Sequence, residues 1–138
     1  MSYPVKLGLK LPYIPNIERV AHDALQQIGD FKNINEDKVD QASILVSEAI
    51  NNALEHADCS NTDLLEVDIE LSKKKLIIYI KDYGSGFNTE NVEKPDINKK
   101  IKSKHKRGWG LQLMRSLSDN FEIESGESGT KIIMYLNL

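Results

Sequence analysis

Residues 47–56 read SEAINNALEH, a stretch with two consecutive asparagines between two glutamates. It lies in a longer segment, from Asn35 to about Asp58, whose apolar residues recur every three or four positions, as in an amphipathic helix. Glu48 and Asn52 are four residues apart, so they lie one turn apart on a face beside the apolar stripe. A solvated polar face is the simpler interpretation, but two consecutive asparagines weaken a helix because their side chains compete for backbone hydrogen bonds. The pattern therefore indicates that something besides helix stability selects them.

Around this helix, segments with the hydrophobic period of strands alternate with segments of helical period. Alternation of apolar and polar residues predicts strands, and Asn16 is placed to cap a first helix. The expected strands cover residues 5–11, 65–71, 76–80, 121–124 and 130–136, and the other helices cover residues 16–28 and 111–117. We therefore expect an α+β fold, a two-layer sandwich of a mixed, mostly antiparallel sheet with helices on one face.

The composition is that of one globular domain over residues 1–138. With 138 residues, of which 40% are hydrophobic, the chain can bury a core but is too short for two ordinary domains. A net charge of -3 gives it no reason to bind nucleic acid or an anionic membrane directly. The lone cysteine, Cys59, suits a reducing compartment, and we see neither a signal peptide nor an apolar run of membrane-spanning length. A cytoplasmic protein is therefore expected.

Three glycine-containing segments follow the central helix. Residues 82–87 read DYGSGF after a strand, residues 107–111 read RGWGL before a helix, and Gly129-Thr130 begins the last strand. An aspartate at a strand end can accept a hydrogen bond from an amino group, and the free N–H groups at a helix start suit phosphate. Each segment alone is weak evidence, because ordinary turns contain such glycines.

In this order, the helix segment and the three glycine segments resemble the asparagine box and the glycine boxes of the GHKL ATPase superfamily. The short chain, the form of residues 47–56 and the Gly-Phe pair at 86–87 are similar to those of bacterial anti-sigma-factor serine/threonine kinases. The resemblance implies the Bergerat ATP-binding fold, with ATP and Mg²⁺ as cofactors and an ATP lid at about residues 83–108. The lysine-rich part of that lid is either a solvated tract or a segment that contacts phosphate or a partner.

The resemblance also implies a role for each motif residue. Asn52 would coordinate the Mg²⁺ that bridges the ATP phosphates, and Glu48 would be the catalytic base that activates the attacking hydroxyl. Asp82 would accept a hydrogen bond from the adenine amino group, with Thr130 beside it. Gly84 and Gly86 would be hinges of the lid. The remaining nucleotide-binding candidates form one segment, in which the N–H groups of the two glycines would contact phosphate: Arg107, Gly108, Trp109, Gly110 and Leu111.

The implied function is that of an ATP-dependent protein serine/threonine kinase that acts as an anti-sigma regulator. Similar kinases bind a sigma factor, phosphorylate a small antagonist protein and form homodimers, here through residues 5–11, which would lie at a sheet edge. Two alternatives stay open: a nucleotide-gated binding module that transfers no phosphate, and the detached ATP domain of a histidine kinase. Glu48 favours the kinase. The surroundings of His22 lack the residues of a phosphoacceptor helix, which disfavours the histidine kinase.

Overall fold

The computed structural model describes residues 4–56, 63–84 and 109–138. Five strands and three helices lie in these ranges. In chain order they are β1 (Val5–Leu11), α1 (Glu18–Lys32), α2 (Glu36–Glu55), β2 (Leu65–Leu71), β3 (Lys75–Asp82), α4 (Trp109–Leu117), β4 (Asn120–Gly126) and β5 (Gly129–Asn137). Each expected element is present, and the lid expected at about residues 83–108 lies almost wholly outside the described residues.

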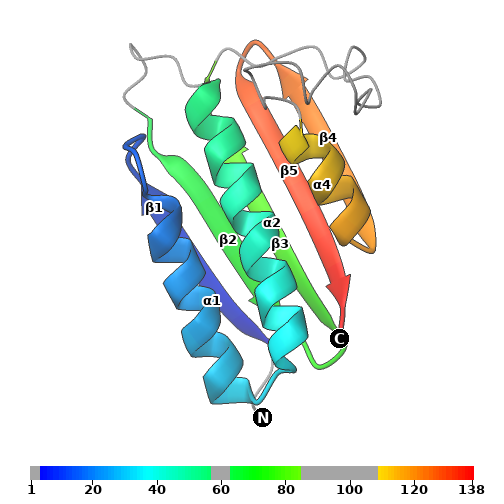
Figure 1. The fold of residues 1–138 in the computed structure, drawn as a ribbon. Helices are drawn as coiled ribbons and strands as arrows, with labels where there is room; N and C mark the ends of the chain where they lie inside the picture. Colours follow the sequence, from blue (N-terminus) through cyan, green and yellow to red (C-terminus); the bar gives the residue numbers. More distant parts are fainter. Residues whose placement is uncertain (1–3, 57–62, 85–108) are drawn as a thin grey trace.

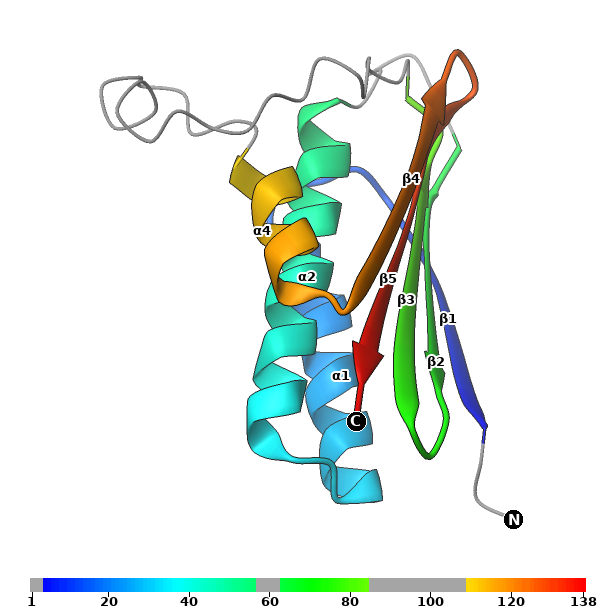
Figure 2. The ribbon, with the colours of Figure 1, turned by 90° about the vertical axis from the view of Figure 1, so that its right-hand side faces the viewer.

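The strands form one sheet in the order β1-β2-β3-β5-β4 (Figure 1). All four pairings are antiparallel, so the described strands contain no parallel pair. The edge-on view shows all three helices on one face of the sheet (Figure 2). The predicted α+β two-layer sandwich is therefore confirmed, but the sheet expected to be mixed is wholly antiparallel in the described strands. β1 is an edge strand, as expected for residues 5–11.

The core lies between the sheet and the helices because the strand residues alternate. Along β2, every second residue is buried against the helices, and the intervening acidic residues face outward. The central helix, α2, packs against both α1 and α4 and also contacts β3 and β5. Its buried face carries Ala42, Ser43, Leu45, Val46, Ala49, Ile50 and Ala53. The small alanines let α2 approach the neighbouring helices closely. As a result, Glu48 on α2 lies next to Gly110 at the start of α4.

The sequence predicted the N-terminal cap of α2 correctly but not that of α1. Asn35 caps α2 as expected, since its side-chain oxygen accepts a hydrogen bond from the Asp37 N–H at 2.8 Å. The expected cap of α1 is wrong: Asn16 adopts a left-handed conformation with φ 70, and Ile17 occupies the cap position without a side-chain hydrogen bond. No helix in the described part of the chain is long and apolar enough to cross a membrane.

Four element ends meet at one end of the molecule. The end of α2, the end of β3, the start of α4 and the start of β5 all lie there, whereas α1 ends at the opposite end (Figure 1). The strand register pairs Asp82, the last residue of β3, with Thr130 on β5. The fold thus brings Asp82 and Thr130 together although 48 positions separate them in the sequence.

Candidate functional site

Two polar side chains of α2 form the first part of the candidate site. Glu48 and Asn52 are partly buried and lie one turn apart, next to the buried face of the helix. Burial raises the pKa of the Glu48 carboxyl above its ordinary value, and the nearby charge of Glu55 raises it further. The Asn52 Nδ2 atom is buried and has no hydrogen-bond partner among the described residues. A buried amide of this kind is a typical feature of a ligand site.

The start of α4 lies directly against Glu48. A Cβ atom added to Gly110 would lie 3.1 Å from Glu48 Oε2, closer than ordinary side-chain contact. At the far end of α4, the Gln41 side-chain amide donates a hydrogen bond to the Leu117 carbonyl and so ties the helix to α2. Glu48, the candidate base, therefore lies where α2 packs against α4.

Asp82 is the most buried charged side chain of the described residues that the sequence singled out, at 2% exposed. Its Oδ1 atom accepts hydrogen bonds from the N–H groups of Gly84 at 3.1 Å and Thr130 at 3.3 Å. Burial raises the pKa of this carboxyl. The two hydrogen bonds and the nearby His56 and Lys81 act in the opposite direction. The carboxylate is thus anchored at the end of the sheet.

Two glycines are required here because backbones approach closely. A Cβ at Gly84 would lie 2.5 Å from the His56 carbonyl oxygen at the end of α2. A Cβ at Gly129 would overlap the Asp82 carbonyl oxygen, and Gly129 also has φ +124, which side chains rarely adopt. The structure thus explains both glycines by packing, and the role of Gly84 as a lid hinge stays a prediction.

The structure also places the remaining candidates. Thr130 is buried and meets Asp82 through its backbone N–H, while its hydroxyl lies 2.7 Å from the hydroxyl of Ser125. Leu111 is 5% exposed and belongs to the hydrophobic core, so the structure gives it a packing role, and a contact with nucleotide stays a prediction. Trp109 begins α4. Gly86, Arg107 and Gly108 lie outside the described residues.

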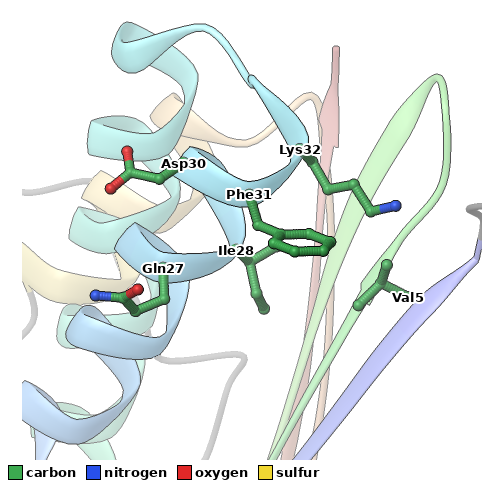
Figure 3. Close-up of a pocket in the computed structure, with 6 residues that line it drawn as sticks. All are labelled: Val5, Gln27, Ile28, Asp30, Phe31 and Lys32. Carbon is green, nitrogen blue, oxygen red and sulfur yellow. The ribbon is translucent and has the colours of Figure 1, made fainter.

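A hollow lies elsewhere in the described part of the chain, between the end of α1 and β1. It measures about 610 Å³ and is lined by Val5, Gln27, Ile28, Asp30, Phe31 and Lys32 (Figure 3). Its lining is mainly apolar, and the end of α1 lies at the opposite end of the molecule from Asp82 (Figure 1). This hollow holds none of the candidate residues.

Tyr13 is a residue of the site that the sequence did not reveal. Its hydroxyl accepts a hydrogen bond from the Tyr83 N–H at 3.0 Å, immediately after Asp82. Seventy residues separate the two tyrosines, and no motif connects them. In the sequence, the position of Tyr13 between Pro12 and Pro15 indicated only the end of a strand.

Among the described residues, no three histidine, cysteine, aspartate or glutamate side chains gather into a group that could hold a metal ion. The metal that the sequence predicts at this site is Mg²⁺, which requires oxygen ligands. Asn52 fits that requirement, because Mg²⁺ prefers oxygen ligands and keeps several waters.

Comparisons with known proteins agree with the fold. The family described as "Histidine kinase-like ATPase domain" matches residues 10–136 of the chain. The chain is 34% identical over 104 residues to the serine-protein kinase RsbW of Staphylococcus aureus strain MSSA476, and 33% identical over 104 residues to that of strain JH9. Both alignments cover 71% of this chain and 65% of the relative, so the chain spans less than two thirds of the relatives it matches.

Solved structures show the same fold. The structure of the RsbU and RsbW domains of Rv1364c from Mycobacterium tuberculosis matches 96% of this chain and 32% of that chain, with a TM-score of 0.69 and 18% identity. The SiaB-SiaC complex from Pseudomonas aeruginosa matches 96% of this chain and 89% of that chain, with a TM-score of 0.60 and 12% identity. At these identities the likeness concerns the fold alone.

Proposed function

Since the chain belongs to the family of histidine kinase-like ATPase domains, we propose that it is a protein serine/threonine kinase that binds ATP with Mg²⁺ at the Asp82 end of the sheet. The observation that supports this proposal best is that α2, the helix with Glu48 and Asn52, ends against the turn that follows the anchored Asp82, where a Cβ at Gly84 would lie 2.5 Å from the His56 carbonyl oxygen. The names of the RsbW relatives agree with the proposed reaction.

Adenine recognition would depend on Asp82. The hydrogen bonds from Gly84 and Thr130 both end on Oδ1, and Oδ2 would accept from the adenine 6-amino group. Because the carboxylate is buried, a purine without this amino group would leave it unpaired, and an unpaired buried acceptor is costly. ATP is therefore expected to bind in preference to GTP.

Asn52 would hold the metal. Its buried amide has an unsatisfied atom among the described residues, and turning the amide would present the oxygen to a cation in the same place. When bound with ATP, Mg²⁺ supplies positive charge that neutralises the phosphate oxygens. The N–H groups at the start of α4 would orient the phosphates beside it.

Glu48 would act as the general base. Burial raises its pKa, which makes the ionised carboxylate a better proton acceptor than that of an exposed glutamate. The carboxylate would take the proton of a serine or threonine hydroxyl as that oxygen attacks the γ-phosphorus and ADP leaves. Glu48 lies against Gly110, and so beside the start of α4, where the phosphates would bind.

The protein substrate would be a small antagonist protein, and a sigma factor would be a second partner. The relatives are named serine-protein kinases, and one matched structure is a complex of two proteins. We also propose a homodimer and a cytoplasmic location. A nucleotide-gated module without phosphotransfer is the alternative, and it would need Asp82 and Asn52 but not Glu48.

Isothermal titration calorimetry and phosphorylation assays test the proposal. We expect the protein to bind ATP with Mg²⁺, to bind GTP more weakly, and to label serine or threonine on a protein encoded beside it in the genome. Asp82→Ala should weaken ATP binding, whereas Glu48→Gln should retain it and lose about 10²- to 10⁴-fold in rate. Equal affinity for ATP and GTP would refute the assignment of Asp82. An unchanged rate in Glu48→Gln would favour another base.

A further inference from the structure

The turn after β3 is supported from a distant part of the chain. Tyr13 lies in the connection between β1 and α1, and the Ile14 N–H donates to the Pro12 carbonyl at 3.0 Å, so that Tyr13 is the middle residue of a tight turn. Its ring packs against the hydrophobic core, and its hydroxyl accepts from the Tyr83 N–H. A side chain placed by both a turn and the core loses little freedom when it makes this bond.

The Tyr83 N–H needs this partner because the strand ladder ends beside it. β2 and β3 pair with Glu66 opposite Lys81, so the same register would place Leu64 opposite Tyr83. β2 begins one residue later, at Leu65. The Tyr13 hydroxyl therefore supplies the acceptor that a longer β2 would have supplied.

This hydrogen bond acts on the peptide that follows the purine-binding carboxylate. On the β5 side, the Thr130 N–H donates to Asp82 Oδ1, and Gly129 lies close against the Asp82 carbonyl. On the β2 side, Tyr13 holds the Tyr83 N–H. Burial and the nearby carboxylates of Asp82, Asp63 and Glu66 raise the pKa of Tyr13, so its hydroxyl stays neutral at pH 7.

We propose that Tyr13 is a positioning residue for nucleotide selectivity: its hydrogen bond to Tyr83 orients the Asp82 carboxylate toward the purine 6-amino group. The proposal rests on the proposed function, because it requires that Asp82 meets adenine. Tyr13 would be a determinant of nucleotide selectivity that lies outside the four motif segments, in the connection between β1 and α1.

Tyr13→Phe tests the proposal, because it removes the hydroxyl and keeps the ring in the core. The control is Tyr79→Phe, which removes a hydroxyl from the outer face of β3. Without nucleotide, hydrogen exchange of the Tyr83 amide should become about 2- to 10-fold faster in Tyr13→Phe only, the factor expected for one hydrogen bond.

With nucleotide, calorimetry compares ATP and purine riboside triphosphate, which lacks the 6-amino group. The preference of the parent protein for ATP should fall about 2- to 10-fold in Tyr13→Phe and stay unchanged in Tyr79→Phe. An equal loss for both nucleotides would mean that Tyr13 only supports the fold and would overturn the proposal, as would unchanged exchange at Tyr83. A parent protein that binds ATP without preference over purine riboside triphosphate would instead overturn the role of Asp82 in the proposed function, and Tyr13 with it, whatever the exchange data show.

Discussion

Gly110 lies so close to Glu48 that a Cβ atom at position 110 would make an unusually tight contact with the carboxylate. The Cβ of any other residue would lie 3.1 Å from Glu48 Oε2. This glycine therefore has a packing role next to Glu48. It leaves room for the carboxylate beside α4, and so couples the position of this helix to that of the proposed base.

Gly110→Ala should impair phosphotransfer more than nucleotide binding. Alanine keeps the backbone N–H and favours helix, so we expect ATP affinity and thermal stability to change little. The added methyl group displaces the Glu48 carboxylate, and a misplaced base should lower the single-turnover rate about 10- to 100-fold. Ser116→Ala, at an exposed position of α4, is the matched control. If ATP binding falls as much as the rate, the main role of Gly110 is phosphate contact.

The rate of phosphotransfer should depend on pH through Glu48. Its pKa is raised, so the carboxylate gains its proton at a higher pH than an exposed glutamate would, and the rate should fall as the pH decreases through that value. Glu55→Gln removes the nearby negative charge, lowers the pKa of Glu48 and should move this fall to lower pH. A pH–rate profile checks both effects. A profile that Glu55→Gln leaves unmoved would contradict this assignment of the base.

Gly129→Ala should destabilise the protein strongly. The Cβ would overlap the Asp82 carbonyl oxygen at a φ of +124, and this conformation is unfavourable for alanine. We expect a loss of about 2–4 kcal/mol in the free energy of unfolding. Gly126→Ala, at the other end of the same turn, is the control, because a Cβ there meets nothing within 4 Å. Urea denaturation of both variants distinguishes a local packing effect from a general effect of the turn.

A homodimer should form along the free edge of β1. Leu9 packs against the core, so Leu9→Lys would mainly test the stability of the monomer. Phe31 is the better probe, because it is 82% exposed and lines the hollow beside Val5 on the edge strand (Figure 3). Phe31→Ser should weaken the dimer about tenfold, as expected for the loss of one aromatic contact.

Ile44→Ser, on the exposed side of α2, should leave that dimer unchanged. Light scattering over a range of concentrations measures both variants. A species of 15.6 kDa at every concentration would reject the dimer.

The sequence predicted the elements because local periodicity reports local burial. The alternation at residues 65–71 and the stripe along 39–53 match β2 and the buried face of α2. The same logic failed at Asn16, where the residue type favours a helix cap but the chain adopts a left-handed turn. Capping depends on the direction from which the chain enters the helix, and the preceding strand and turn set that direction.

The sequence by itself determined the fold class, the order of the motifs and the identity of Glu48, Asn52 and Asp82 as candidates, because residue type and spacing report helix, strand and turn. Only the tertiary structure decided which of these residues meet. The pairing of Asp82 with Thr130, the contact of Glu48 with Gly110 and the bond from Tyr83 to Tyr13 each join distant segments. Their geometry depends on strand register and on the distance between packed helices, and the whole core sets both through close packing.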